Sequence, residues 1–273
     1  MFKTSKFQWH LMPVSLFLAV VGLWAILAPR PAQAQTFTGM TGERDRITLG
    51  FQVRSQDLQG LLPAPWRVEP FAGGPLKGTN FLVVFVNRIR EDDLEGKPRY
   101  SGTNPFIAII APVKHAQTGQ TLLVMLDGFG MNSLPFAGVP GYYKVYRQAT
   151  IRVEHASKSH ELDAEEVTDV WQVRDATGPG GVELRLQCLV DVGARTRDAG
   201  AVEHISAKDP ALWRIYKFDA ATDVVKSVPQ RIDRVQAYTF RLTVPQYSKL
   251  FDGSEQLIGI TLLPWYVRQT FVR

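Results

Sequence analysis

The sequence holds a single cysteine, Cys188, among its 273 residues. One thiol cannot close an intrachain disulfide, so the small disulfide-stapled domains common among exported proteins are excluded. Cys188 lies inside the apolar run of residues 182–192. We therefore interpret it as a small buried hydrophobic residue.

The sequence also lacks the short motifs that mark many enzyme classes. It contains no His-Glu-x-x-His zinc motif, no Gly-x-Ser-x-Gly nucleophile elbow, no phosphate-binding loop and no dinucleotide fingerprint. His155, His160 and Glu161 are close together, but residues 155–166 are polar and loop-like, so we expect no metal site. No cofactor is predicted.

Apolar runs long enough to span a bilayer are absent except near the N-terminus. Lys3 and Lys6 precede the apolar residues 11–28, and the run ends in the small-residue sequence Ala32-Gln33-Ala34. This build predicts a secretory signal peptide over residues 1–34, with cleavage near Ala34 and a periplasmic or secreted domain of residues 35–273. The alternative is an uncleaved anchor, since about 18 apolar residues can just span a bilayer.

The formal net charge of +5 comes partly from the predicted signal peptide. Cleavage would remove Lys3, Lys6 and Arg30 from the 31 basic residues, which leaves 28 against 26 acidic ones and a net charge near +2. No basic cluster with interleaved aromatic residues remains. Nucleic acid is therefore not an expected partner.

Alternation of apolar and polar residues is typical of half-buried strands. It is clear in residues 46–53, where Ile47, Leu49 and Phe51 share one face. Further strands are predicted at residues 81–86, 106–113, 121–126, 145–153, 167–173, 182–192, 212–218, 235–244 and 257–262. The charged residues 88–104 are interpreted as a solvated loop that forms a lid or rim.

Helix is predicted only in short pieces, at residues 55–60, at residues 245–251 and from Pro264 onward. About ten short strands with so little helix predict a mainly β, single-domain chain. Closing an antiparallel sheet into a β-barrel removes its unpaired edges, and we expect this arrangement. The pattern alone does not separate a barrel from a sandwich.

The segment Gly141-Tyr142-Tyr143-Lys144 resembles the Gly-Tyr-Pro-Lys sequence that carries the Schiff-base lysine of the acetoacetate decarboxylase family. Other stretches resemble the family in the same order: residues 58–69 (LQGLLPAPWRVE), 80–87, 112–113, 121–127 and 255–271 (EQLIGITLLPWYVRQTF). The resemblance spans nearly the whole predicted mature chain. It implies a single β-barrel that encloses a small-ligand cavity, and a homo-oligomer.

The resemblance also implies a chemistry for Lys144. In the family, a lysine amine attacks the ketone of a β-keto acid, and the resulting imine takes up the electrons released as carbon dioxide leaves. The amine must be neutral to react, and burial or a neighbouring cation lowers its pKa. Lys144 is therefore the candidate catalytic residue.

Three positions depart from the family pattern. Val145 stands where the family has a second lysine, Phe106 stands where it has a glutamate, and Tyr143 replaces the proline before the lysine. Desolvation alone can still lower the pKa of a lysine. The two missing charged groups nevertheless weaken the case for decarboxylation.

Several other residues are candidates for substrate binding. Arg44 and Arg46 bracket a position where the resemblance implies an arginine near the substrate carboxylate, and the spacing does not choose between them. Phe106, Tyr142 and Tyr143 are candidates for the pocket wall.

Strict alternation along residues 145–153 would direct Lys144 away from the apolar face of the strand, unless a bulge intervenes. The same alternation directs Arg147 toward the apolar side. Arg147 is therefore a candidate for carboxylate binding, with a salt bridge at the rim as the alternative.

Two functions follow from these observations, beside a third hypothesis in which the resemblance concerns the fold only and the protein has a structural or envelope role. The first is an exported carbon-carbon lyase that forms a Schiff base between Lys144 and a small keto acid or related carbonyl compound. The second is a non-catalytic barrel that has lost the decarboxylase residues and still binds a small organic acid or carbonyl ligand.

Overall fold

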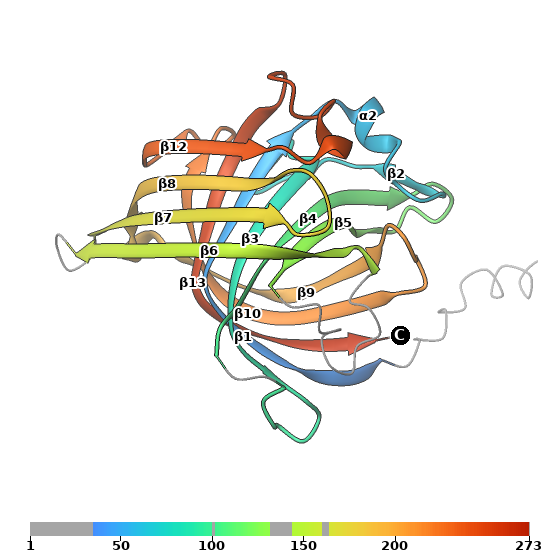
Figure 1. The fold of residues 1–273 in the computed structure, drawn as a ribbon, viewed down its shortest axis with the longest axis horizontal. Helices are drawn as coiled ribbons and strands as arrows, with labels where there is room; N and C mark the ends of the chain where they lie inside the picture. Colours follow the sequence, from blue (N-terminus) through green and yellow to red (C-terminus); the bar gives the residue numbers. More distant parts are fainter. Residues whose placement is uncertain (1–34, 100–101, 132–143, 160–163, 273) are drawn as a thin grey trace, which may run out of the picture. The chain divides into compact units, whose positions relative to one another are not determined.

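A computed structural model describes residues 35–99, 102–131, 144–159 and 164–272, and most of these residues lie in strands (Figure 1). The strands are β1 (Thr36–Gln52), β2 (Trp66–Val68), β3 (Phe81–Asp92), β4 (Asn104–His115), β5 (Thr121–Gly130), β6 (Tyr146–Ser159), β7 (Ala164–Asp175), β8 (Gly181–Asp191), β9 (Thr196–Ser206), β10 (Trp213–Ser227), β11 (Ile232–Asp233), β12 (Val235–Leu242) and β13 (Gln256–Val272). The described helical segments are short: α2 (Ser55–Gln59), η2 (Val192–Ala194) and η3 (Pro245–Tyr247). The mainly β class with few short helices is confirmed.

Part of the sheet closes into a ring. Strands β5, β9, β10, β13, β1, β3 and β4 pair in that order, and β4 pairs back with β5. All of these pairs are antiparallel except β5 with β9, which is parallel. The expected closure of the sheet is therefore present as a barrel-like ring.

Four further strands leave the ring at β5. The last residues of β5 pair in parallel with β6, and β7, β8 and β12 follow in order. These strands lie side by side across β3, β4 and β5 (Figure 1). The main hydrophobic core lies between them and the outer face of the ring, where the rings of Phe85 on β3 and Trp171 on β7 meet edge to face at 5.3 Å.

A second apolar cluster fills part of the ring interior. It is formed by side chains of β3, β4, β5 and β10 together with Val145, just before β6: Leu82, Val84, Val86, Phe106, Ala108, Ile110, Met125, Val145 and Tyr216. Successive residues of a strand point to opposite faces, so β3 and β4 contribute to both clusters.

The strand β1 changes which residues face the ring interior at Asp45, where φ is 49°. On one side of Asp45 the buried odd-numbered Glu43 faces inward. On the other side the odd-numbered Ile47 faces the main core, and Arg46 lines the ring cavity. The pairing of β1 with β3 has an irregularity at the same place, between Arg44 and Ile47. This bulge brings Glu43 and Arg46 to one face of the strand.

The loop of residues 69–79 covers one end of the ring. Its Leu76 side chain lies over Gly50 and Gly259, which pair across β1 and β13. A Cβ atom added at Gly259 would lie 2.8 Å from Leu76 Cδ2, so only glycine allows this approach. The Ser227 hydroxyl donates a hydrogen bond of 2.8 Å to the Pro75 carbonyl and fixes the loop in place.

A strand is present at each of the ten predicted positions, two predictions about helical or irregular segments are wrong, and one long strand was missed. No helix begins at Pro264, because β13 continues through it and pairs with β1 on both sides. Arg88 is fully buried in β3 instead of lying in a solvated loop. Strand β9 was not predicted, since its first half is exposed and polar.

The predicted signal peptide, residues 1–34, lies outside the described part of the chain, and its cleavage stays a prediction. None of the described helices has the length and apolar character needed to cross a membrane.

Candidate functional site

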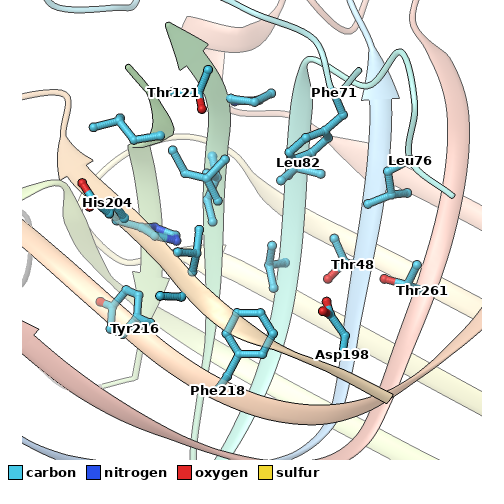
Figure 2. Close-up of a pocket in the computed structure, with 18 of the residues that line it drawn as sticks. Thr48, Phe71, Leu76, Leu82, Thr121, Asp198, His204, Tyr216, Phe218 and Thr261 are labelled. Atoms are coloured by element: carbon cyan, nitrogen blue, oxygen red, sulfur yellow. The ribbon is translucent and has the colours of Figure 1, made fainter. Parts of the chain in front are cut away.

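A cavity of about 1030 Å³, partly open to solvent, lies inside the ring. Its walls come from β1, β3, β4, β5, β9, β10 and β13, and the loop of residues 69–79 contributes Phe71 and Leu76. In Figure 2, His204 and Tyr216 lie on one side of this cavity and Thr48 and Thr261 on the other. The cavity has two guanidinium groups in its lining, those of Arg46 and Arg268.

Arg46 is the candidate carboxylate ligand that the structure brings into the cavity. Its guanidinium donates a hydrogen bond to the Tyr266 hydroxyl and lies 3.5 Å from the carboxylate of Glu43. Its side chain is 20% exposed. Arg44 instead has a side chain that is 54% exposed and pairs with the adjacent Asp45. The bulge at Asp45 thus places Arg46, and not Arg44, in the lining of the ring cavity.

Glu43 lies beneath the cavity and is fully buried. Its carboxylate is 3.1 Å from a guanidinium nitrogen of Arg268, closer than Arg46 approaches. Burial alone would raise the pKa of Glu43, but the charges of Arg268, Arg46 and Arg88 outweigh it and lower the pKa. Glu43 therefore stays ionised, and it holds both cavity arginines by charge.

Arg268 is oriented from three sides. Besides its contact with Glu43, its Nε atom donates a hydrogen bond of 2.9 Å to the Thr41 hydroxyl. Its guanidinium carbon lies 4.2 Å from the centre of the Tyr216 ring. A guanidinium held by a carboxylate, a hydroxyl and an aromatic face is preorganised, so its positive charge stays at the cavity wall.

Phe106 lies in the apolar cluster beside the cavity, at the position of the family's glutamate. The guanidinium carbon of Arg88 lies 4.5 Å from the centre of its ring, and Arg88 forms an ion pair with Glu91. Phe106 is 3% exposed and is not part of the cavity lining. An aromatic ring thus supports a buried arginine where the resemblance implied a carboxylate.

His204 is a cavity residue that the sequence did not single out. Its ring centre is 5.1 Å from that of Tyr216. Burial, followed by the charges of Arg268 and Arg46, lowers the pKa of His204 to about 3. The imidazole is therefore neutral near pH 7 and can exchange hydrogen bonds with a ligand without carrying charge.

Lys144 does not line the cavity in the described part of the chain. Its side chain is 56% exposed, and its Nζ atom donates a hydrogen bond of 2.8 Å to Asp209 Oδ2. The backbone at Lys144 has φ of 53°, and the next residue, Val145, is buried in the ring-interior cluster. Tyr142 and Tyr143, the other two candidates in this segment, lie outside the described residues.

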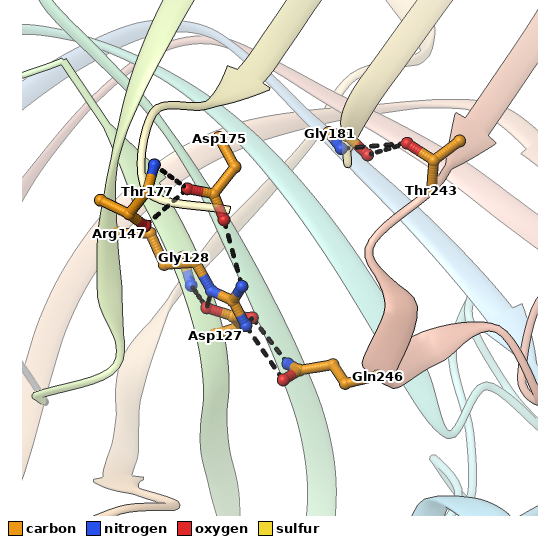
Figure 3. Close-up of polar contacts among 8 residues, drawn as sticks. All are labelled: Asp127, Gly128, Arg147, Asp175, Thr177, Gly181, Thr243 and Gln246. Carbon is orange, nitrogen blue, oxygen red and sulfur yellow. Dashed lines mark hydrogen bonds and ion pairs between the residues drawn. The ribbon is translucent and has the colours of Figure 1, made fainter. Parts of the chain in front are cut away.

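Arg147 belongs to a polar network away from the cavity (Figure 3). Its guanidinium pairs with Asp127 at 2.8 Å and with Asp175 at 3.1 Å, and Gln246 accepts a further hydrogen bond of 2.9 Å. Burial raises the pKa of Asp127 although Arg147 opposes the shift. The network joins β5, β6, β7 and η3, so Arg147 has partners of the kind expected for a structural ion pair.

His155 lies in β6, where a loop was predicted. Its Nδ1 atom is 2.8 Å from Asp169 Oδ1 on β7, and its Nε2 atom is 4.0 Å from Asp45 Oδ1. Within the described residues, no group of three or more histidine, cysteine or acidic side chains is arranged to hold a metal ion. His160 and Glu161 lie outside the described part of the chain.

Comparison with solved structures finds proteins of the same fold at low sequence identity. The enduracididine biosynthesis enzyme MppR with HEPES buffer bound has a TM-score of 0.51 and 9% identity, over 87% of each chain. MppR complexed with pyruvate has a TM-score of 0.50 and 9% identity, over 89% of this chain and 91% of that one. An acetoacetate decarboxylase-like enzyme from Sphingomonas wittichii RW1 has a TM-score of 0.49 and 12% identity, over 86% and 91%.

No protein-family model matches the chain, and no curated protein sequence matches it. The structural likeness to MppR covers most of both chains, but at 9% identity it shows a shared fold and not a shared activity.

Proposed function

We propose that the ring cavity binds a small organic acid through the guanidinium of Arg46. The observation that carries this proposal is that one buried carboxylate, that of Glu43, is shared by two guanidinium groups. Arg268 approaches it more closely, while Arg46 lies 3.5 Å away and lines the cavity. The planar Arg46 guanidinium can donate two parallel hydrogen bonds to a ligand carboxylate.

The neutral His204 suits the recognition of an uncharged oxygen on the same ligand. A 2-oxo or hydroxyl group beside the carboxylate can exchange a hydrogen bond with its imidazole, which does not titrate near pH 7. The neighbour MppR has been solved with pyruvate, a 2-oxo acid, and this supports the ligand class.

Thermal denaturation with a panel of acids tests the proposal. Pyruvate, acetoacetate and butanoate are expected to raise the melting temperature, whereas butanamide, which lacks the charge, is not. A ligand at a hundredfold excess over its Kd stabilises the folded state by about 2.7 kcal/mol.

The matched variants are Arg46→Gln, which removes one of the two cavity guanidinium groups, and Arg44→Gln, which removes the exposed guanidinium two residues away. The acid-dependent shift is expected to disappear only in Arg46→Gln. Equal shifts in the two variants would refute the assignment to Arg46, and no shift with any acid would refute the binding function.

A carbon-carbon lyase that forms an imine on Lys144 is the second candidate, and the Gly-Tyr-Tyr-Lys resemblance favours it. Such an enzyme requires the amine to leave Asp209 and turn toward the ring. Borohydride reduction in the presence of acetoacetate would then add mass to the peptide that contains Lys144, and Lys144→Ala would abolish the adduct. An intact wild-type protein that gives no adduct excludes this candidate.

The site of action is proposed to lie outside the cytoplasm, in the periplasm or in the secreted fraction, because residues 1–34 have the build of a signal peptide. Mass spectrometry of the exported protein is expected to find Gln35 at the N-terminus. Membrane-bound protein that retains residues 11–28 would support the anchor instead.

A further inference from the structure

The size of the ring cavity bears on which acid it binds. Its volume of about 1030 Å³ is just above the range of about 300 to 1,000 Å³ that is typical for ligand pockets. Pyruvate or acetoacetate would fill only a small part of this space. A ligand that fills the cavity must therefore carry a sizeable group in addition to its carboxylate.

The walls of the cavity show the chemistry of that group. Strands β3, β4 and β5 contribute the aliphatic side chains of Leu82, Val84, Ile110 and Leu123. These side chains are contributed by neighbouring strands, so they form a continuous apolar wall. Burial of an apolar chain against this wall favours binding, whereas a polar chain would find no hydrogen-bond partners there.

The register of β1 gives the length over which the group can extend. Arg46 lies at one end of the inward-facing row and Gly50 lies four residues further on, under Leu76. At about 3.3 Å per residue, the two positions are about 13 Å apart. A ligand carboxylate at Arg46 therefore leaves room for a chain of medium length before it reaches the loop of residues 69–79.

The acidic residues of the cavity lining bear on the charge of the ligand. Glu69 and Asp198 are exposed to solvent, and the half-buried Glu203 accepts hydrogen bonds from Gln120 and Trp213. These three acidic residues add negative charge to a lining that holds two arginines, Arg46 and Arg268, and this charge disfavours a second carboxylate on the ligand. The lining thus favours one negative charge and an uncharged tail.

We infer that the ligand is an amphipathic monocarboxylic acid, bound with its carboxylate at Arg46 and its aliphatic chain along Leu82, Val84, Ile110 and Leu123. This inference rests on the proposed function, because it requires the carboxylate to bind at Arg46. It adds the class of acid, an aliphatic chain of medium length, which the proposed function alone does not specify.

Calorimetric titration of the purified protein with butanoate, hexanoate, octanoate and decanoate tests the inference. The Kd is expected to fall by about fourfold for each added methylene, as full burial of a methylene predicts, until the chain reaches Leu76. Sebacate, which has the length of decanoate and a second carboxylate, is expected to bind at least about tenfold more weakly than decanoate.

The variant Thr261→Phe fills the middle of the cavity, because Thr261 pairs with Thr48, two residues from Arg46 along β1. This variant is expected to bind butanoate but to show no fall in Kd as the acid becomes longer. Thr239→Phe, at an exposed position of β12 outside the ring, is the matched control and is expected to retain this fall in Kd. Val202→Phe, which fills the cavity from β9, serves if Thr261→Phe does not fold.

The outcomes separate this inference from the function on which it rests. Arg46-dependent binding of butanoate with a Kd that does not change with chain length would overturn the inference and leave the proposed function standing. Failure of every acid to bind would overturn both. If the Kd still fell with chain length in Thr261→Phe and Val202→Phe, the aliphatic chain of the ligand would lie outside the ring, and this would also overturn the inference.

Discussion

Lys144 and Val145 are adjacent in the sequence, and their side chains lie in opposite environments. The Lys144 amine is 2.8 Å from the Asp209 carboxylate at the surface, whereas Val145 is 1% exposed in the ring-interior cluster. The family's second lysine falls on Val145. An apolar side chain therefore occupies the inward position of this segment, and the remaining amine points outward.

This arrangement predicts unequal effects of two alanine substitutions. Val145→Ala is expected to lower the free energy of unfolding by about 2 kcal/mol, because it removes buried methyl groups and leaves a cavity. Lys144→Ala is expected to leave the melting temperature close to that of the wild type, since it removes only an exposed ion pair. Denaturant titration of both variants measures the difference, and a larger loss for Lys144→Ala would contradict the assigned environments.

The contact between Leu76 and Gly259 predicts that the loop of residues 69–79 tolerates no side chain beneath it. Gly259→Ala brings a Cβ atom to 2.8 Å from Leu76 Cδ2 and to 2.9 Å from the Lys226 carbonyl oxygen. We expect a loss of about 1 to 3 kcal/mol from overpacking and faster tryptic cleavage at Lys77. Gly73→Ala, with no atom within 4 Å of the added Cβ, is the control and should cleave at the wild-type rate.

The Arg147 network predicts a structural role for this arginine. Arg147→Met leaves the buried Asp127 and Asp175 without their cation and is expected to cost about 3 kcal/mol. Arg152→Met, which breaks an exposed pair with Glu154, is expected to change stability by less than about 0.5 kcal/mol. Acid binding in Arg147→Met should match the wild type, and a selective loss of binding would instead make Arg147 a ligand residue.

The pair His155 and Asp169 predicts a dependence of stability on pH. The hydrogen bond to Asp169 raises the pKa of His155, with burial opposing the shift. In the unfolded chain a histidine has a pKa of about 6.5, and below that pH the pair stabilises the folded state fully. This stabilisation is lost as the pH rises through the higher pKa of His155 in the folded state. Burial also raises the pKa of Asp169, with the hydrogen bond to His155 opposing the shift.

His155→Gln is therefore expected to flatten the fall in stability above about pH 6.5. Urea denaturation of the wild type and the variant at several pH values between 5.5 and about 8.5 measures the difference. Parallel curves for the two proteins would show that His155 does not titrate in this window.

The sequence predicts the strands well where one face is buried. Ile47, Leu49 and Phe51 alternate with the residues between them, and all three are in the main core. The same signal is missing in β9, because the exposed residues 196–201 bury neither face. Period-two alternation reports burial of one face, so it cannot report a strand that is held by pairing alone.

The cavity residues are harder to predict, because they depend on breaks in alternation. Glu43 and Arg46 reach the same face only through the bulge at Asp45, and nothing in the residue pattern around Asp45 distinguishes a bulge from a regular strand. Arg88 can be buried because its guanidinium stacks on the ring of Phe106 and pairs with the carboxylate of Glu91. Phe106 lies on β4, and Glu91 lies three residues after Arg88 on β3. Burial of a charged residue is decided by such partners, which a single sequence does not identify.

The measurement that tests the central claim most directly is a crystal structure of the protein with 2-oxooctanoate, which carries both a carboxylate for Arg46 and a ketone for Lys144. We predict that the carboxylate lies inside the ring, about 2.7 to 2.9 Å from the Arg46 guanidinium nitrogens, with the chain along Leu82 and Ile110. A ligand bound outside the ring, or joined to Lys144 through an imine with Arg46 untouched, would contradict the account.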